Sequence, residues 1–394
     1  MASQTEKKKR GGKQASPGTS KATDVEVEKN GKKSAGPNGR SVDVPDVLEI
    51  HASARTYHAD AYRHDQLGLS EEKLLAMYRN MLLQRRFEER AAQMYGKQKI
   101  AGFLHLYIGQ EAVSTGAAAA MELGKDTVIT AYRDHGLGLA LGMGANESMA
   151  ELYGRIGGSS RGKGGSMHFF DREKGMYGGH GIVGAHIPVA TGIAFAHKYK
   201  EDGGVCLCFF GDGAVGQGAF HEAANLAALW ELPLVLVIEN NQYAMGTAVH
   251  RAFAEPEFFK QAIGYGMESS MVHGMDVLTT TRAFQDHIAM ARENKPSLME
   301  IRTYRYRGHS MSDPAKYRTK EELERRKDED PIIRLKKYLL DNRLGTNDSL
   351  DQVDEEVKNE VMESVEFAEN SPFPPTESIY EDVYTQKDYP FLTN

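Results

Sequence analysis

The spacing of apolar residues changes from one segment of the chain to the next, and each spacing predicts an element. Between residues 70 and 96 the apolar positions recur every three or four residues, which predicts an amphipathic helix. The stripe consists of Leu74, Met77, Tyr78, Met81 and Leu82. We expect Ser70 to cap the first turn of this helix and Gly96 to end it.

Two shorter segments, residues 205–210 and 234–238, are unbroken apolar runs of the kind found in buried parallel strands. A helix through residues 221–231 is expected between them, which makes a βαβ unit with a right-handed crossover. Further strands are expected at 128–131 and 298–304. The predicted fold class is therefore α/β, with a mostly parallel sheet flanked by helices.

Charge is distributed unevenly and predicts two regions. The 394 residues carry 48 Lys and Arg against 55 Asp and Glu, a net charge of −7. Residues 1–40 alone hold ten Lys and Arg and four Asp and Glu, with few apolar side chains. Such a segment cannot bury enough apolar surface to offset its ordering entropy. We expect a disordered basic tail at 1–46 and a folded domain at 47–394 that ends in a helical tail.

Composition disfavours several classes of protein. The longest aliphatic run, residues 234–238, is too short to span a bilayer. The negative net charge gives no support for nucleic-acid binding. Cys206 and Cys208 cannot form a disulfide framework, and we expect buried thiols on one face of a strand. The Lys-rich start, with few arginines, is unlike a secretory signal or a transit peptide, which favours a cytoplasmic, bacterial protein over a mitochondrial one.

Glycine is concentrated between Gly154 and Gly218, where it makes up 18 of 65 residues. Apolar residues such as Met167 and Phe169 are interleaved with these glycines, and a flexible linker does not need them. Because glycine lets the backbone approach a ligand closely, we expect these glycines to surround a binding site.

The segment 211–216 reads Gly-Asp-Gly-Ala-Val-Gly between a predicted strand and a predicted helix, and two kinds of site fit it. One is a dinucleotide site, with Glu239 at the end of the next strand as its acidic partner. Asp212 argues against this, because a carboxylate beside a diphosphate repels it unless a cation lies between them. The residues therefore favour a divalent metal, and Mg²⁺ suits oxygen ligands and phosphate.

Asn241 is expected to supply a second oxygen to the metal. It lies 29 residues after Asp212, a gap that one helix and two short strands fill. Both residues then fall at the carboxyl ends of neighbouring parallel strands, where α/β proteins bind ligands. A nearby backbone carbonyl can supply a third oxygen. This pair of residues predicts a metal–diphosphate site.

Gly-Asp-Gly at 211–213 followed by Asn240-Asn241 resembles the thiamine-diphosphate motif. From about residue 69 to 331 the chain resembles the α subunit of the E1 component of pyruvate dehydrogenase complexes, in the thiamine-diphosphate-dependent 2-oxo acid dehydrogenase family. The matching stretches are 102–107, 109–112, 130–133, 178–184, 239–247 and 304–314. The resemblance implies the thiamine-diphosphate-binding fold, with thiamine diphosphate and Mg²⁺ as cofactors.

The resemblance also assigns roles to residues of this chain. Asp212, Asn241 and the carbonyl of Tyr243 match the family's Mg²⁺ ligands. The groups that match its diphosphate contacts are Tyr132, Arg133, His309 and the backbone of Gly213 and Ala214, which we expect at the start of a helix. The backbone of Gly181 and Val183 matches the segment lining the aminopyrimidine. The residues that match histidines near the reacting centre are His105 and His309, and His135 and His180 lie in matching segments.

The implied reaction is that of pyruvate dehydrogenase (acetyl-transferring): oxidative decarboxylation of pyruvate, with transfer of the acetyl group to the lipoyl group of E2. In the family the glutamate that protonates the aminopyrimidine belongs to the β subunit, and no second glycine-rich βαβ signature follows Pro331 here. We therefore expect an α₂β₂ heterotetramer with an E1 β subunit. A lipoylated E2 acyltransferase is the further expected partner, and nucleic acid and membrane are not.

Alternatives come from the same class and from others. Branched-chain 2-oxo acid and acetoin dehydrogenases have similar E1 α subunits, but the run 309–314 resembles the pyruvate enzymes more. A non-catalytic binding subunit is disfavoured by the intact Asp212, Asn241 and His309. A nicotinamide oxidoreductase is the third alternative, and calorimetry with thiamine diphosphate and Mg²⁺ against NAD separates it from the others.

Overall fold

The computed structural model describes residues 54–383, so the basic tail predicted at 1–46 lies outside the described residues and stays a prediction. The strands are β1 (Ala54–Tyr57), β2 (Thr127–Ala131), β3 (Met176–His180), β4 (Cys206–Gly211), β5 (Leu234–Asn240), β6 (Tyr243–Ala244), β7 (Thr247–Ala248), β8 (Glu268–His273) and β9 (Ser297–Arg302). The α-helices are α1 (Glu71–Gly96), α2 (Glu111–Ala120), α3 (His135–Ala140), α4 (Ala145–Leu152), α5 (His186–Lys200), α6 (Gly218–Leu229), α7 (Val249–Ala252), α8 (Val277–Arg292), α9 (Lys320–Lys327), α10 (Pro331–Asp341) and α11 (Asn347–Asn370).

Seven of these strands form one parallel sheet in the order β1-β8-β9-β5-β4-β2-β3. The strands β6 and β7 form a separate antiparallel hairpin. The predicted α/β class with a parallel sheet is therefore confirmed. The expected strands at 128–131, 205–210, 234–238 and 298–304 correspond to β2, β4, β5 and β9, with ends shifted by one or two residues.

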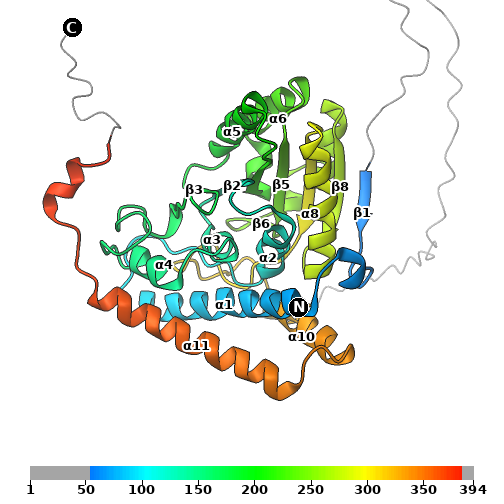
Figure 1. Ribbon diagram of the computed structural model, residues 1–394. Helices are drawn as coiled ribbons and strands as arrows, with labels where there is room; N and C mark the ends of the chain where they lie inside the picture. The colour runs from blue at the N-terminus through cyan, green and yellow to red at the C-terminus, as the bar shows by residue number, and fades with distance from the viewer. Residues whose placement is uncertain (1–53, 384–394) are drawn as a thin grey trace, which may run out of the picture. The chain divides into compact units, whose positions relative to one another are not determined.

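Alternate residues of the central strands enter two separate cores, one on each face of the sheet. Leu207 and Phe209 of β4 pack with the core that contains α1, α2 and α8. Cys206 and Cys208 of the same strand face the core that contains α5 and α6, and both thiols are buried, as expected. Helices thus cover both faces, with α5 and α6 adjacent to each other in Figure 1.

The long helix α1 begins and ends where the sequence predicts. The Ser70 hydroxyl accepts the backbone N–H of Lys73, which satisfies one free donor of the first turn. Its stripe of apolar residues is buried. The helix α11 runs beside α1 (Figure 1) and packs on both α1 and α4, with Val357 and Val361 buried. The predicted C-terminal helix is therefore part of the core, and Arg86 fixes it through two bonds to Asp354, at 2.8 and 2.9 Å.

The carboxyl ends of β4 and β5 lie next to each other, because Gly211 pairs with Glu239 in the parallel ladder. The loops that carry Asp212 and Asn241 therefore start side by side, as predicted. No helix between residues 54 and 383 is long and apolar enough to cross a membrane.

Candidate functional site

The loops that follow β2, β3, β4, β5 and β9, together with the segment before α2, line a cavity of about 830 Å³, which we call the main cavity. It brings together every residue predicted for the site except Arg133. These residues are His105, Tyr132, Gly181, Val183, Asp212, Gly213, Ala214, Asn241, Tyr243 and His309. Its rim carries exposed apolar side chains, namely Phe103, Val183 and Met245.

The three groups predicted as metal ligands form one wall of the main cavity. Asp212 is only 2% exposed, and its Oδ2 has no hydrogen-bond partner. Burial raises the pKa of Asp212 to about 6, although Arg305 and the backbone of Asn241 lower it. Arg305 Nη1 donates to Asn241 Oδ1 at 3.4 Å and to the Tyr243 carbonyl at 3.1 Å. The oxygens of Asn241 and Tyr243 thus already bind one positively charged group, the guanidinium of Arg305.

Two histidine rings and a tyrosine ring meet on another wall. The ring centroids of His105 and His309 are 5.1 Å apart, and Tyr132 lies 4.7 Å from His105 and 5.5 Å from His309. Burial, with Arg133 adding to it, lowers the pKa of His105 to about 3 and that of His309 to about 4. Both rings are neutral near pH 7. The Nδ1 atoms of both rings are buried and have no hydrogen-bond partner within the described residues.

Arg133 lies behind the main cavity rather than on its surface. Its guanidinium donates to the Leu106 carbonyl at 2.6 Å and to the His309 carbonyl at 2.8 Å. It therefore connects the two segments that carry His105 and His309. Burial lowers the pKa of Arg133 to about 10, so the group keeps its charge at neutral pH and its field reaches both histidines.

Gly213 and Ala214 lie in a 3₁₀ turn, Asp212–Gly216, and the α-helix that we expected to start here begins only at Gly218. The two backbone groups therefore precede α6 by about one turn. A side chain at Gly213 would place its Cβ 2.7 Å from the Cβ of Ala244, so this position must be glycine for the two loops to meet. Gly181 and Val183 follow β3 and also line the main cavity.

A buried network that the sequence did not reveal supports the segment of His105. His135 Nδ1 contacts both oxygens of Glu88 at 3.1 Å, and its Nε2 lies 3.0 Å from Ser166 Oγ. Burial opposes protonation, but the Glu88 carboxylate raises the pKa of His135. Serine, histidine and a carboxylate also form the catalytic triad of many hydrolases. Here Ser166 is buried, and its hydroxyl accepts the backbone N–H of His105 at 3.2 Å. The network holds the backbone of His105.

The glycine-rich segment folds around a carboxylate instead of a ligand over residues 158–165. Glu151 is fully buried and accepts four backbone N–H groups, from Ser160, Gly162, Gly164 and Gly165, at 2.7 to 3.0 Å. A Cβ at Gly158 would lie 2.3 Å from Glu151 Oε2. The expected close approach of glycine to a ligand stays a prediction for Gly181 and Gly213, which line the main cavity, whereas the glycines of this loop approach Glu151 instead.

Glu239, the acid that the dinucleotide alternative requires, is not available to a ligand. It is buried and accepts the hydroxyl hydrogen of Tyr107. Burial raises the pKa of Glu239 to about 7. An acid in this position cannot contact a ribose, so the structure removes the main support for a nicotinamide site.

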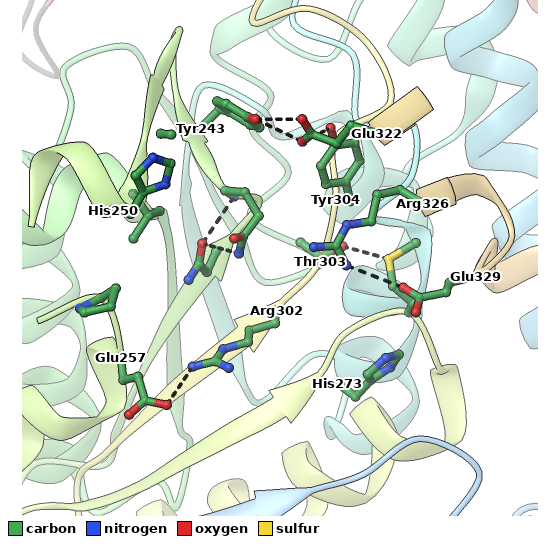
Figure 2. Close-up of a pocket in the computed structure, with 16 residues that line it drawn as sticks. Tyr243, His250, Glu257, His273, Arg302, Thr303, Tyr304, Glu322, Arg326 and Glu329 are labelled. Atoms are coloured by element: carbon green, nitrogen blue, oxygen red, sulfur yellow. Dashed lines mark hydrogen bonds and ion pairs between the residues drawn. The ribbon is translucent and has the colours of Figure 1, made fainter. Parts of the chain in front are cut away.

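A second cavity of about 620 Å³ lies beside the main one, and Tyr243 lines both. Figure 2 shows that the charged side chains on its walls pair with one another. Arg302 lies 3.4 Å from Glu257, and Arg326 lies 3.7 Å from Glu329. Glu322 receives the hydroxyl of Tyr243 at 2.9 Å. The loop that carries Asn241 and Tyr243, two of the three predicted metal ligands, therefore lies between the main cavity and the second cavity.

Comparison of the chain with known protein families identifies the family to which it belongs. The family model of the dehydrogenase E1 component matches residues 79–377, which include every predicted site residue. The chain belongs to the dehydrogenase E1 component family. This family is thiamine-diphosphate dependent, and the main cavity is the place in this E1 chain where the predicted cofactor residues meet.

Relatives of this E1 chain match it over most of their own length. The pyruvate dehydrogenase E1 component subunit alpha of Rhizobium meliloti (strain 1021) is 51% identical over 316 residues, which are 80% of this chain and 90% of the relative. The subunit of the same name from Zymomonas mobilis is 48% identical over 334 residues, 84% of this chain and 91% of the relative. That of Rickettsia felis is 47% identical over 316 residues, 80% of this chain and 97% of the relative.

The donor set of the main cavity fits a hard divalent cation. One carboxylate, one amide oxygen and one backbone carbonyl are oxygen ligands of the type that Mg²⁺ takes, with water and phosphate completing the shell. Between residues 54 and 383 there is no cluster of three or more His, Cys, Asp or Glu side chains that could hold a metal. The buried Oδ2 of Asp212, which has no hydrogen-bond partner, is the observation that favours a cation here.

Proposed function

We propose that this chain is the α subunit of a pyruvate dehydrogenase E1. With a β subunit it would catalyse the oxidative decarboxylation of pyruvate and transfer the acetyl group to the lipoyl group of E2. The observation that carries the proposal is that the buried carboxylate of Asp212, with its unpaired Oδ2, lines the same cavity as the adjacent rings of His105 and His309. The names of the relatives favour pyruvate over branched-chain 2-oxo acids or acetoin.

The side chains of the main cavity would hold the cofactor and contact the substrate. Asp212, Asn241 and the Tyr243 carbonyl would hold Mg²⁺, and Tyr132 and the backbone of Gly213 and Ala214 would contact the diphosphate. When bound, thiamine diphosphate supplies the nucleophilic carbon and the electron sink that decarboxylation needs. His105 and His309 are neutral near pH 7, so each would hydrogen-bond to the substrate as a neutral ring.

Arg133 would act on the reaction by holding both histidine segments at a fixed separation, through the carbonyls of Leu106 and His309. Its positive charge disfavours protonation of either ring. Contact between Arg133 and the diphosphate, which the family resemblance implies, would require the guanidinium to leave one of these carbonyls.

The rim of the main cavity supports the proposed β subunit. Phe103, Val183 and Met245 are exposed on this rim, and Ile182, next to Val183 in the chain, is 74% exposed. Apolar side chains grouped around a polar cavity are typical of a surface that a partner covers. We propose that a β subunit covers this rim in an α₂β₂ assembly and contributes the ring-protonating glutamate. The cytoplasmic location stays a prediction.

The test compares the purified chain with the chain co-expressed with an E1 β subunit from the same genome. We expect calorimetry to detect binding of thiamine diphosphate that requires Mg²⁺ in the co-expressed assembly, and no binding of NAD. Pyruvate turnover should require both subunits, because the chain alone leaves the reacting centre exposed. Robust pyruvate turnover by the chain alone would contradict the two-subunit site, and preferential turnover of 2-oxoisovalerate or acetoin would contradict the substrate.

A further inference from the structure

The loop of residues 240–246, which we call the metal loop, is held in a strained conformation. Gln242 has φ of 78° and Met245 has φ of 52°, and neither is glycine. Left-handed backbone at such residues is unfavourable and persists only where the surroundings hold it in place. Tyr243, whose carbonyl is a proposed metal ligand, lies between these two residues.

On the side of the main cavity, Arg305 holds the metal loop. Its Nη1 donates to the Tyr243 carbonyl at 3.1 Å and its Nη2 to the Met245 carbonyl at 3.1 Å. A bound metal would compete with Arg305 for the Tyr243 carbonyl, because both seek the same oxygen. With a metal on the Tyr243 carbonyl, only the bond from Arg305 to the Met245 carbonyl would remain of these two.

On the side of the second cavity, Glu322 holds the side chain of the same residue. The Tyr243 hydroxyl lies 2.9 and 3.1 Å from the two oxygens of Glu322, and the Tyr304 hydroxyl donates to Oε1 at 2.7 Å. Figure 2 shows both phenols meeting this carboxylate. None of these contacts uses the carbonyl of Tyr243, so all of them are compatible with a bound metal.

Glu322 is itself fixed by the start of α9. Thr319 caps this helix and accepts the backbone N–H of Glu322 at 3.1 Å. The carboxylate thus joins three elements: α9, the segment after β9 that carries Tyr304, and the metal loop. A charged acceptor shared by two phenols makes stronger hydrogen bonds than a neutral one.

We propose that Glu322 is a positioning residue for the metal site, which holds the ring of Tyr243 so that the Tyr243 carbonyl stays aligned with Asn241 and Asp212. This inference rests on the proposed function, because it assumes that the main cavity binds Mg²⁺ with thiamine diphosphate. The competing explanation is that Glu322 only attaches α9 to the edge of the sheet. The two explanations differ in what happens to the metal requirement.

The experiment measures, in the assembled α and β subunits, the Mg²⁺ concentration that gives half-maximal thiamine-diphosphate binding, followed by intrinsic fluorescence without substrate. Outer-shell substitutions commonly weaken metal affinity 10–100-fold, so Glu322→Gln should raise this concentration roughly tenfold. Glu321→Gln is the matched control, because Glu321 is the exposed neighbour on the same turn, and it should leave the concentration unchanged. The KM for pyruvate at saturating Mg²⁺ should be unchanged in both variants.

Tyr243→Phe provides a second variant that removes only the hydroxyl and keeps the proposed ligand. It should raise the Mg²⁺ requirement as Glu322→Gln does. The double variant should have a Mg²⁺ requirement close to that of either single variant, because both substitutions disrupt the same contact between Tyr243 and Glu322. A Mg²⁺ requirement equal to that of Glu321→Gln, with only a lower melting temperature, would overturn the positioning role. Absence of Mg²⁺-dependent binding in the parent would overturn the proposed function itself.

Discussion

Asp212 and Glu151 are both buried carboxylates beside glycine-rich loops, but their surroundings differ. Glu151 is fully buried and both of its oxygens are satisfied by backbone N–H groups. Asp212 is 2% exposed, and one of its oxygens has no partner. The fold itself therefore satisfies both oxygens of Glu151, whereas Asp212 Oδ2 would gain a partner only from a bound cation.

The difference separates a structural role from a functional one within a single stretch of sequence. A buried charge that the fold itself satisfies stabilises the native state, and its removal leaves donors unpaired. A buried charge left unpaired lowers stability, and a protein retains it where function requires it. Three variants test whether the two carboxylates differ in this way.

The largest effect is expected for Asp212→Ala in the assembled enzyme. Loss of the metal removes several kcal/mol of charge stabilisation, so turnover of pyruvate should fall at least ~1000-fold. The fold should be intact, because Asp212 Oδ2 has no hydrogen bond to lose and the substitution also removes the free-energy cost of burying the charge. Activity assays with circular dichroism and Mg²⁺ titration make the measurement. A folded variant with the parent's rate and Mg²⁺ requirement would refute the metal assignment.

Glu151→Gln should damage the fold instead of the cofactor site. The amide nitrogen of glutamine cannot accept, so two of the four backbone N–H groups would lose their partner, at roughly 2–4 kcal/mol in total. Chemical denaturation should show this loss, and limited proteolysis should cleave within 158–165. The control is Glu147→Gln, an exposed position of the same helix. If instead the stability is unchanged and cofactor binding is lost, Glu151 belongs to the functional site.

The sequence alone predicted the elements that depend on local patterns. Unbroken apolar runs located β4 and β5, and the carboxyl ends of parallel strands brought Asp212 and Asn241 to one edge. The cap at Ser70 located the start of α1 because capping is a local hydrogen bond. The 3₁₀ turn at Asp212–Gly216 was not predicted, since the same residues suit the first turn of an α-helix.

The contacts that complete the site depend on distant segments and could not be predicted. Arg305 reaches the metal loop from the segment after β9, and its place in the stretch 304–314 was the only signal. Glu88, His135 and Ser166 come from three separate segments. Glu151 resembles any surface glutamate of a helix until the loop 158–165 folds over it.

The smallest of the three effects is a pH-dependent gain of stability in Asp212→Asn without cofactor. Burial raises the pKa of Asp212 to about 6, whereas an unfolded aspartate titrates near 4. Between these values the folded chain keeps a proton that the unfolded chain has lost, so the group destabilises the fold progressively as pH rises through this window. Asparagine does not titrate and avoids this loss.

Asp212→Asn should therefore raise the stability of the cofactor-free assembly at pH 8 by on the order of 2 kcal/mol and change it little near pH 4. Thermal or denaturant unfolding at both pH values provides the measurement, with the exposed Asp328→Asn as control. A gain of equal size at both pH values would show that ionisation of Asp212 is not its source. A loss of stability at pH 8 would show that the fold satisfies Asp212 as it satisfies Glu151, and the distinction between the two carboxylates would then disappear.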